Sequence, residues 1–246
     1  MKHLYRWIYV WIFLAIIALF GIYFFAQHRF ETKKINKIQV KFTSEKNHFI
    51  SENMVDNLLK QNLPRGSNVK IEDVNLATLE QVLRTHEMIE DAQVYLSPKG
   101  VLCAEVKQKT AIARVVTPIT SYYIDDKGNR MSLSQEFSAH LPIVFGNVNT
   151  NIKDSLCVLL EKARQDEFLK NTLTEIHILA DNSVQLGVRD YDYSIEFGKL
   201  KEIDKKIQNY KAFVHHAQQD SLIQTYKNVN LRFTEQVICA KHTKDE

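Results

Sequence analysis

The residues most capable of chemistry in this chain are its cysteines, one adjacent pair of histidines and a few closely spaced carboxylates. Cys103, Cys157 and Cys239 are widely spaced, and each lies among apolar residues. Zinc sites use paired Cys-x-x-Cys or Cys and His spacings, and disulfide-rich folds use a denser set of cysteines. We therefore predict buried free thiols, with one Cys–Cys bridge as the alternative.

His215 and His216 end a stretch with a helical apolar pattern. Adjacent residues of a helix point about 100° apart, so this pair cannot hold one metal ion as two histidines four residues apart can. A protonated imidazole near the carboxyl end of a helix is stabilised by the helix dipole. We predict that role for the pair, and no metal site.

Two groups of acidic residues could bind calcium or cleave sugars. The run Asp125-Asp126-Lys127-Gly128-Asn129 lacks the alternating ligands and the distal Glu of a calcium loop, and it is typical of a hairpin tip. Asp190, Asp192 and Glu196 resemble a glycosidase set in type, but Asp190-Tyr191-Asp192 is more simply a polar turn. The sequence has no Gly-x-Ser-x-Gly, His-Glu-x-x-His or nucleotide-binding glycine loop. We predict no catalytic, cofactor-binding or metal-binding residues, and a protein that is not an enzyme.

The first element that could position an interaction surface is the apolar stretch from Trp7 to Ala26, which has no charge and no proline. About twenty helical residues span roughly 30 Å, the thickness of the hydrocarbon core of a bilayer. A signal peptide has an apolar region of only about 7–15 residues and small residues at its exit, whereas this stretch ends in Tyr23-Phe24-Phe25. The sequence predicts a head of residues 1–6 and a retained transmembrane helix over residues 7–27.

The charges beside this stretch do not fix its orientation, because basic residues lie on both sides of it. Lys2 and Arg6 precede the stretch, and Arg29, Lys33, Lys34 and Lys37 follow it. The remainder of the chain holds all 29 acidic residues and 30 of the 32 basic ones (32 less Lys2 and Arg6), which leaves it nearly neutral. A nucleic-acid binder usually shows a basic stripe, and none is visible here.

Residues 35–115 follow the order strand, helix, helix, strand, strand. Residues 38–42 alternate between apolar and polar, and Ser51 and Asn75 can cap two short helices. Two later alternating runs are joined by the turn Ser97-Pro98-Lys99-Gly100. This order is what a POTRA module looks like, a three-stranded sheet with two helices on one face. Such modules are common docking units just outside membranes.

A second, larger domain is predicted over residues 116–241, before a tail of residues 242–246. Its predicted elements are a helix around 156–163, strands near 176–178, 184–188 and 193–197, a helix with an apolar stripe from Leu200 to Val214, and one long strand over 229–239.

The second half of the chain contains four phrases that occur in a fixed order, behind a POTRA-like module and one N-terminal span. In this order they resemble the bacterial cell-division family FtsQ/DivIB. They are YYIDDKGNRMSL, LPIVFG, SVQLGVRDYDYSIEFGKLKEIDKKIQNY and NVNLRFTEQVICAK. The resemblance covers almost the whole chain. It departs at Ala111, where many relatives have a proline, and in the short head. It implies an α+β fold: a single N-terminal transmembrane helix, a POTRA-like β-α-α-β-β module, and a larger mixed β-sheet domain with helices.

The same resemblance implies a scaffold of the divisome in the cytoplasmic (inner) membrane. Its single span would leave the N-terminus in the cytoplasm and the C-terminal domains in the periplasm, at the division septum. The scaffold would link early and late division proteins and regulate septal peptidoglycan synthesis. It would bind FtsB/DivIC-like and FtsL-like proteins, with no cofactor, nucleic acid or small-molecule substrate. Carried over by position, the partner-binding residues are Tyr226, Arg232, Phe233, Thr234, Glu235, Gln236 and Val237.

The expected means of binding is strand addition, in which a partner segment pairs with an exposed sheet edge. The POTRA-like region is expected to make a second contact. Two alternatives stay open. A POTRA-containing factor of outer-membrane protein assembly usually has tandem modules or a barrel of about ten-residue strands, and neither follows here. An anchored envelope enzyme or sensor would need a liganded pocket.

Overall fold

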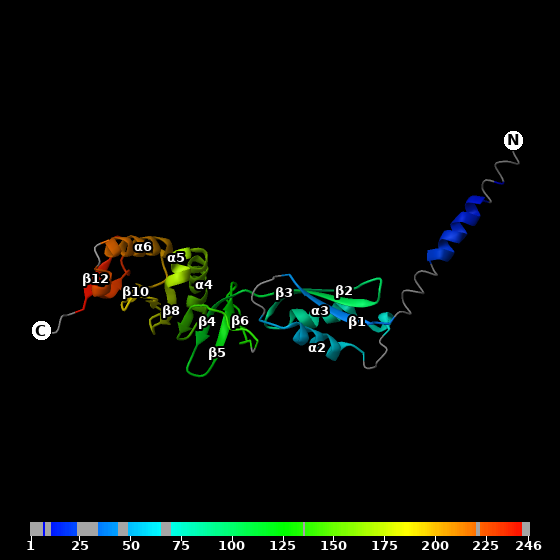
Figure 1. Cartoon of the computed structure of the whole chain (residues 1–246), viewed down its shortest axis with the longest axis horizontal. Helices are drawn as coiled ribbons and strands as arrows, with labels where there is room; N and C mark the ends of the chain where they lie inside the picture. The colour runs from blue at the N-terminus through cyan, green and yellow to red at the C-terminus, as the bar shows by residue number, and fades with distance from the viewer. Residues whose placement is uncertain are drawn as a thin grey trace. The chain divides into compact units, whose positions relative to one another are not determined.

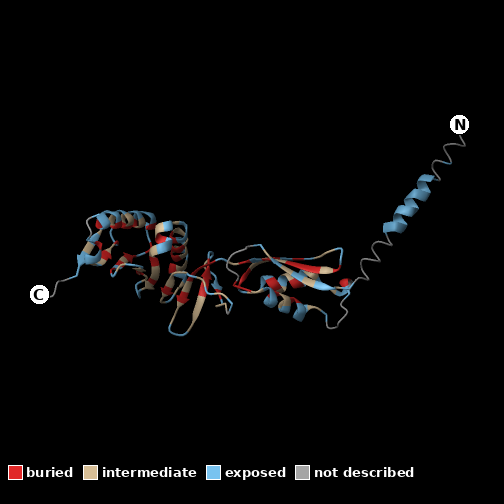
Figure 2. Cartoon of the chain, viewed as in Figure 1, coloured by how far each residue is buried: buried red, intermediate tan, exposed pale blue. Residues whose placement is uncertain are grey.

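The structure is a computed structural model, and it describes residues 7, 11–23, 34–43, 49–64, 70–134, 136–219 and 222–242. Trp7 and residues 11–23 are helical and exposed (Figure 2). Within the described ranges, no helix is both long and apolar enough to cross a membrane. The predicted head of residues 1–6, residues 8–10 and 24–27 of the predicted span, and residues 243–246 of the predicted tail lie outside the described residues.

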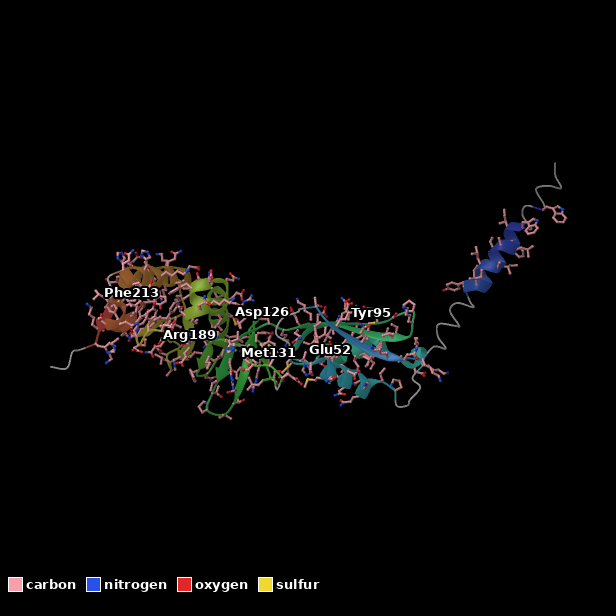
Figure 3. The ribbon with its side chains drawn as sticks, viewed as in Figure 1. Glu52, Tyr95, Asp126, Met131, Arg189 and Phe213 are labelled. Atoms are coloured by element: carbon pink, nitrogen blue, oxygen red, sulfur yellow. The ribbon has the colours of Figure 1, made fainter. Side chains whose placement is uncertain are left out.

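The remainder divides into two compact units, which meet in the sequence at Gln108 and Lys109. The predicted boundary at residues 115 and 116 differs from this division. The reason is that the strand over Ala111–Val116 pairs with strands of the second unit on both of its edges. Glu52 and Tyr95 mark the first unit in Figure 3, and Met131, Arg189 and Phe213 mark the second.

The first unit has the predicted order of strand, helix, helix, strand, strand (Figure 1). Its elements are β1 (Lys37–Phe42), α2 (Glu52–Asn62), the 3-10 turn η1 (Ile71–Asp73), α3 (Leu76–Arg84), β2 (Ile89–Leu96) and β3 (Val101–Gln108). The sheet order is β1-β3-β2, with β1 parallel and β2 antiparallel to β3. The predicted caps are confirmed, because the side chains of Ser51 and Asn75 accept bonds from the amides of Met54 and Thr78.

The core of the first unit lies between one face of this sheet and the two helices. Its buried residues include Val55 and Leu59 of α2, Leu79 and Leu83 of α3, and Val94, Leu102, Ala104 and Val106 of the strands. Because alternate residues of a strand face opposite sides, the other face of the sheet carries Lys37, Gln39 and Lys41, which are all exposed. The burial of β1 is therefore one-sided, as its alternating sequence predicts.

The second unit is built on a nine-stranded mixed sheet in the order β12-β11-β10-β9-β8-β7-β4-β5-β6. Its strands are β4 (Ala111–Val116), β5 (Ser121–Asp125), β6 (Arg130–Met131), β7 (Ile143–Phe145), β8 (Leu173–Ile178), β9 (Val184–Val188), β10 (Ser194–Gly198), β11 (Tyr226–Asn230) and β12 (Ile238–Lys241). Its helices are α4 (Thr150–Gln165), α5 (Glu167–Thr172), α6 (Ile203–Gln219) and the 3-10 turn η2 (Ile223–Thr225).

The strand registers place one buried apolar residue from each central strand in a single row. These residues are Val115, Val144, Ile176, Leu186, Ile195 and Val229. They share one core with apolar residues of α4, α5 and α6, which lie along the same side of the sheet in Figure 1. The adjacent row holds Phe145, His177, Gln185, Glu196 and Asn230, all half-buried. The sheet is therefore apolar toward the helices and largely polar on its other face.

The α+β class, the predicted helix around Leu156 and the three strands near residues 176–197 are confirmed. The helix predicted from the apolar stripe is confirmed as α6, which begins at Ile203, with Leu200 buried in the connection before it. One prediction for the C-terminal part is wrong. The single long strand over 229–239 is two antiparallel strands, β11 and β12, with a connection between them.

Candidate functional site

The strand β12 forms one edge of the nine-stranded sheet, and β6 forms the other. Within the described part of the chain, β12 pairs only with β11. Three of its four residues are exposed, and Ile238 is 46% exposed. An edge strand presents unpaired backbone N–H and C=O groups that another chain can pair with. Because β6 has only two residues, β12 is the better template of the two edges.

The structure brings six of the predicted partner-binding residues together and separates the seventh. Arg232 to Val237 form most of the connection between β11 and β12, not part of a strand. Tyr226 is the first residue of β11 and lies opposite Lys241, at the far end of the hairpin from this connection. The predicted segment therefore borders the β12 edge, whereas Tyr226 stabilises the other end of the hairpin.

The connection between β11 and β12 is attached at several points. The amide of Leu231 donates to the carbonyl of Glu196 at 2.9 Å, and the Leu231 side chain is buried. On α6, the side-chain amide of Asn209 donates to the carbonyl of Thr234 at 2.8 Å. Val237 packs against the core before β12 begins. Between these attachments the chain exposes Phe233, at 51%, as the largest apolar side chain of the connection.

The Glu196 carboxylate joins the connection to β10 and β11. One of its oxygens accepts from the side-chain amide of Asn228 at 3.2 Å. The other accepts from Asn230 at 3.0 Å and lies 3.2 Å from the guanidinium of Arg232. A half-buried carboxylate needs such donors to replace water. This arrangement gives Glu196 a role in holding β10, β11 and the connection together.

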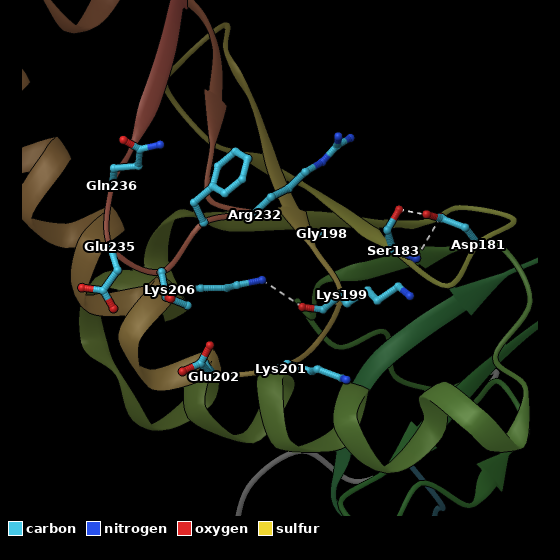
Figure 4. Close-up of a pocket in the computed structure, with 12 residues that line it drawn as sticks. Asp181, Ser183, Gly198, Lys199, Lys201, Glu202, Lys206, Arg232, Glu235 and Gln236 are labelled. Carbon is cyan, nitrogen blue, oxygen red and sulfur yellow. Dashed lines mark hydrogen bonds between the residues drawn. The ribbon is translucent and has the colours of Figure 1, made fainter.

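A pocket of about 660 Å³ lies beside this connection (Figure 4). It is lined by residues 232–236 together with residues of the β8–β9 turn and of the segment that leads into α6. The pocket takes in Lys206, which is only 4% exposed and which the sequence analysis did not select. Its ammonium donates to the carbonyls of Phe197 at 2.7 Å and Lys199 at 2.9 Å. Burial lowers the pKa of Lys206.

The aromatic residues between α6 and the strands fix the position of the helix behind the site. The hydroxyls of Tyr193 and Tyr210 lie 3.0 Å apart in the core, and burial raises the pKa of Tyr210 to about 12. Phe213, labelled in Figure 3, packs edge-on against Tyr226 with ring centroids 5.2 Å apart. The ammonium of Lys241 lies 5.6 Å from the centre of the Tyr226 ring. Tyr226 therefore connects both strands of the hairpin to α6.

The other residues whose side chains could take part in chemistry are dispersed. All three cysteines are free thiols, and Cys103 is buried whereas Cys157 and Cys239 are half-buried. The hairpin tip is confirmed, with the carboxylate of the buried Asp125 accepting bonds from the amides of Lys127 and Asn129. Among the residues that the structure describes, no three His, Cys, Asp or Glu side chains are placed to hold a metal ion.

The two exposed groups singled out in the sequence lie where they were expected. His215 and His216 lie in the last turns of α6, and both are exposed. Asp190 has a φ of 69° in the turn between β9 and β10, and Asp192 is exposed in the same turn. The polar turn is therefore confirmed.

Comparison with known proteins gives two family matches. A family described as FtsQ/DivIB, C-terminal related, matches residues 110–240, and a POTRA-like domain matches residues 33–107. One similar solved structure is the major extracytoplasmic domain of the bacterial cell-division protein DivIB from Geobacillus stearothermophilus, in its trans isomer. It is 15% identical and covers 46% of this chain and 96% of its own, with a TM-score of 0.33, which is too low to support an argument. No curated protein matches.

The two family matches follow the two units of the structure. The first covers β4 to β12 apart from the last residue of β12, and the second covers the three-stranded unit. FtsQ/DivIB proteins are non-enzymatic proteins of bacterial cell division, with extracytoplasmic domains at the septum. Since the first match alone spans more than half of the sequence, the chain belongs to the FtsQ/DivIB family and has a role in cell division.

Proposed function

We propose that this chain is a non-enzymatic scaffold of the division machinery that is anchored in the inner membrane and binds FtsB/DivIC-like and FtsL-like partners by strand addition at β12. The uncharged stretch from Trp7 to Ala26 supports the single span, with the N-terminus in the cytoplasm and both units outside it. In this role the chain links early and late division proteins and regulates septal peptidoglycan synthesis through its partners.

The observation that carries this proposal is the composition of the β12 edge. Soluble proteins commonly protect an edge strand with charged residues, proline or a covering element. Here β12 carries one charged residue, Lys241, and it presents the exposed Ile238 next to the connection that exposes Phe233. An edge strand with so little protection is a suitable template for strand addition by another chain.

The individual residues would then have different roles. Ile238 and Phe233 would contact apolar side chains of the added strand, while backbone pairing with β12 would supply most of the hydrogen bonds. Arg232 is held by Glu196 and would present its remaining donors at the same edge. Tyr226 would act by positioning the hairpin, since it packs on Phe213 behind the strands.

Binding of the extracytoplasmic segment of the FtsB-like protein of the same organism to the full chain tests this proposal. Ile238→Asp is expected to raise the Kd at least about tenfold, because it places a charge in an apolar strand contact. Val158→Asp is the matched control, because Val158 on α4 is 47% exposed, close to the 46% of Ile238. Equal increases in Kd for the two substitutions would contradict partner binding at the β12 edge.

Depletion of the protein separates this role from outer-membrane assembly, the other function that a POTRA-like module allows. We expect chains of undivided cells. Outer-membrane defects without filamentation would contradict the proposal.

A further inference from the structure

We propose that Lys206 is a positioning residue of the partner site at β12, and that it fixes the direction in which the connection between β11 and β12 presents Phe233. This inference rests on the proposed binding of a partner at β12. Lys206 lies in the first turn of α6 and is only 4% exposed, whereas Phe233 is 51% exposed. Both residues line the pocket beside the connection (Figure 4).

The ammonium of Lys206 joins the start of α6 to the end of β10. It donates to the carbonyls of Phe197 at 2.7 Å and of Lys199 at 2.9 Å, and Figure 4 shows the second of these bonds. It also lies 4.9 Å from the centre of the Phe197 ring. Because these carbonyls replace the water that a buried ammonium has lost, removing the bonds is costly. Lys206 therefore fixes the backbone on both sides of Gly198 relative to α6.

The residue before Phe233 is attached to this same end of β10. Gly198 has a φ of 73°, and a Cβ atom at this position would lie 2.9 Å from Cγ of Arg232. The guanidinium of Arg232 lies 3.2 Å from the carboxylate of Glu196, two residues earlier on β10. The position of Arg232 thus depends on the backbone at the end of β10, which the bonds from Lys206 hold in place.

The residue after Phe233 is attached to α6. The side-chain amide of Asn209 on α6 donates to the carbonyl of Thr234 at 2.8 Å. The ammonium of Lys205 also lies 3.2 Å from the carboxylate of Glu235, but both side chains are largely exposed, so this ion pair contributes little. Thr234 therefore follows α6, whereas the residue before Phe233 follows β10.

Phe233 lies between these two attachments, so its direction depends on how β10 and α6 are spaced. Lys206 bonds across this space from inside the protein. An apolar side chain that is already oriented before binding loses less conformational entropy in the complex. Without the Lys206 bonds, Phe233 would stay exposed but would be less fixed. The partner would then bind more weakly, although no residue that it contacts has changed.

Lys206→Met tests this role, because it removes both hydrogen bonds and fills most of the same buried volume. The measurement is binding of the extracytoplasmic segment of the FtsB-like partner to the full chain. We expect the Kd to rise about five- to tenfold. Urea unfolding checks that the variant is folded. If it is not, Lys206→Gln takes its place, because it keeps an N–H donor in the buried position.

Asp125→Asn is the matched control for a general loss of stability. Asp125 is also a buried charged residue, 1% exposed, that bonds backbone groups of the second unit. It lies on β5, next to the edge of the sheet opposite β12. Both variants are expected to lower the free energy of unfolding, but only Lys206→Met is expected to raise the Kd. In the free protein, only Lys206→Met should speed hydrogen exchange of residues 231–236.

A double-mutant cycle shows whether Lys206 acts through Phe233. In the Phe233→Ala background, Lys206→Met should change the Kd less than about twofold, because the side chain that it positions is absent. An unchanged Kd for Lys206→Met, a rise no larger than that of Asp125→Asn, or the same rise in the Phe233→Ala background would overturn the inference.

Ile238→Asp separates these results from the proposed function itself. A wild-type chain that does not bind the partner, or an Ile238→Asp variant that binds as tightly as the wild type, would contradict partner binding at β12. If Ile238→Asp weakens binding but Lys206→Met fails one of the three criteria above, only the role of Lys206 is overturned.

Discussion

The carboxylate of Glu196 on β10 and the guanidinium of Arg232, two residues past β11, lie 3.2 Å apart. The amide of Leu231 donates to the carbonyl of the same Glu196 at 2.9 Å. These two contacts hold the chain against β10 where it leaves β11. They also place the connection, with its exposed Phe233, next to the free edge of β12.

Glu196→Gln is expected to destabilise the second unit by about 1–3 kcal/mol, the range for losing hydrogen bonds to a charged group. Its new amide would face the donors of Asn228 and Asn230. Urea unfolding measures the loss. Glu175→Gln is the control, since Glu175 shares the polar face but, among the described residues, pairs only with His177. A change below about 0.5 kcal/mol for both variants would contradict this account of Glu196.

Gly198→Ala is expected to cost about 1–2 kcal/mol, because Gly198 has a φ of 73° that L-residues rarely adopt. The added methyl group would also lie 2.9 Å from Cγ of Arg232. A double-mutant cycle with Arg232→Ala separates the two effects. In the double variant, the cost of the contact between the new methyl group and Arg232 should disappear, and the cost of the left-handed backbone should remain. Losses of unfolding free energy that simply add in the double variant would contradict the close approach of Gly198 to Arg232.

Asp166 caps α5 and pairs with Lys211 of α6. Burial would raise the pKa of Asp166, but bonds from Lys211 and from the amide of Leu169 lower it overall. A carboxyl with a lowered folded pKa contributes stability above its unfolded value, near 3.8, and loses it as pH falls through the folded value.

Asp166→Asn keeps a capping side chain and removes the charge, so we expect a loss of about 0.5–1 kcal/mol at pH 7. Thermal unfolding of both proteins from pH 7 to pH 2 is the measurement. The gap between them should begin to close as pH falls below the unfolded pKa near 3.8, and it should disappear only below the lowered folded pKa, where the wild-type carboxyl is protonated. A constant gap over this range would show that the ion pair with Lys211 contributes nothing.

Gln108 at the end of β3 is buried, and its side-chain oxygen accepts from the amide of Phe49 at 2.8 Å. Gln108→Met removes this acceptor and is expected to destabilise the first unit by about 1–3 kcal/mol. Gln93→Met, at an exposed position of β2, should change stability by less than about 0.5 kcal/mol. Equal losses in denaturant unfolding would show that the buried bond is unimportant.

Local patterns predicted most of the first unit, because Ser51 and Asn75 cap its helices and its first strand alternates in burial along its length. They failed between Asn230 and Ile238 for a physical reason. Phe233 and Val237 continue a pattern that strands allow, whereas the contacts that the connection makes with Glu196 and Asn209 involve residues distant in the sequence. No local signal carries that information.

Lys206 was missed although it falls on the buried stripe of α6, between Ile203 and Tyr210. A lysine is normally expected at the surface. Its burial depends on the two carbonyls at the end of β10, which only the folded chain brings within reach. The site residues taken from the family resemblance lie at the β11–β12 hairpin, but the edge strand itself, Ile238–Lys241, was not among them.

Hydrogen exchange of the β12 amides in the full chain, with and without the extracytoplasmic segment of the FtsB-like partner, tests strand addition most directly. A saturating partner should slow exchange at those amides of residues 238–241 that point away from β11, and should leave β6, at the other edge, unchanged. Unchanged exchange across β12 in the saturated complex would contradict strand addition at this edge.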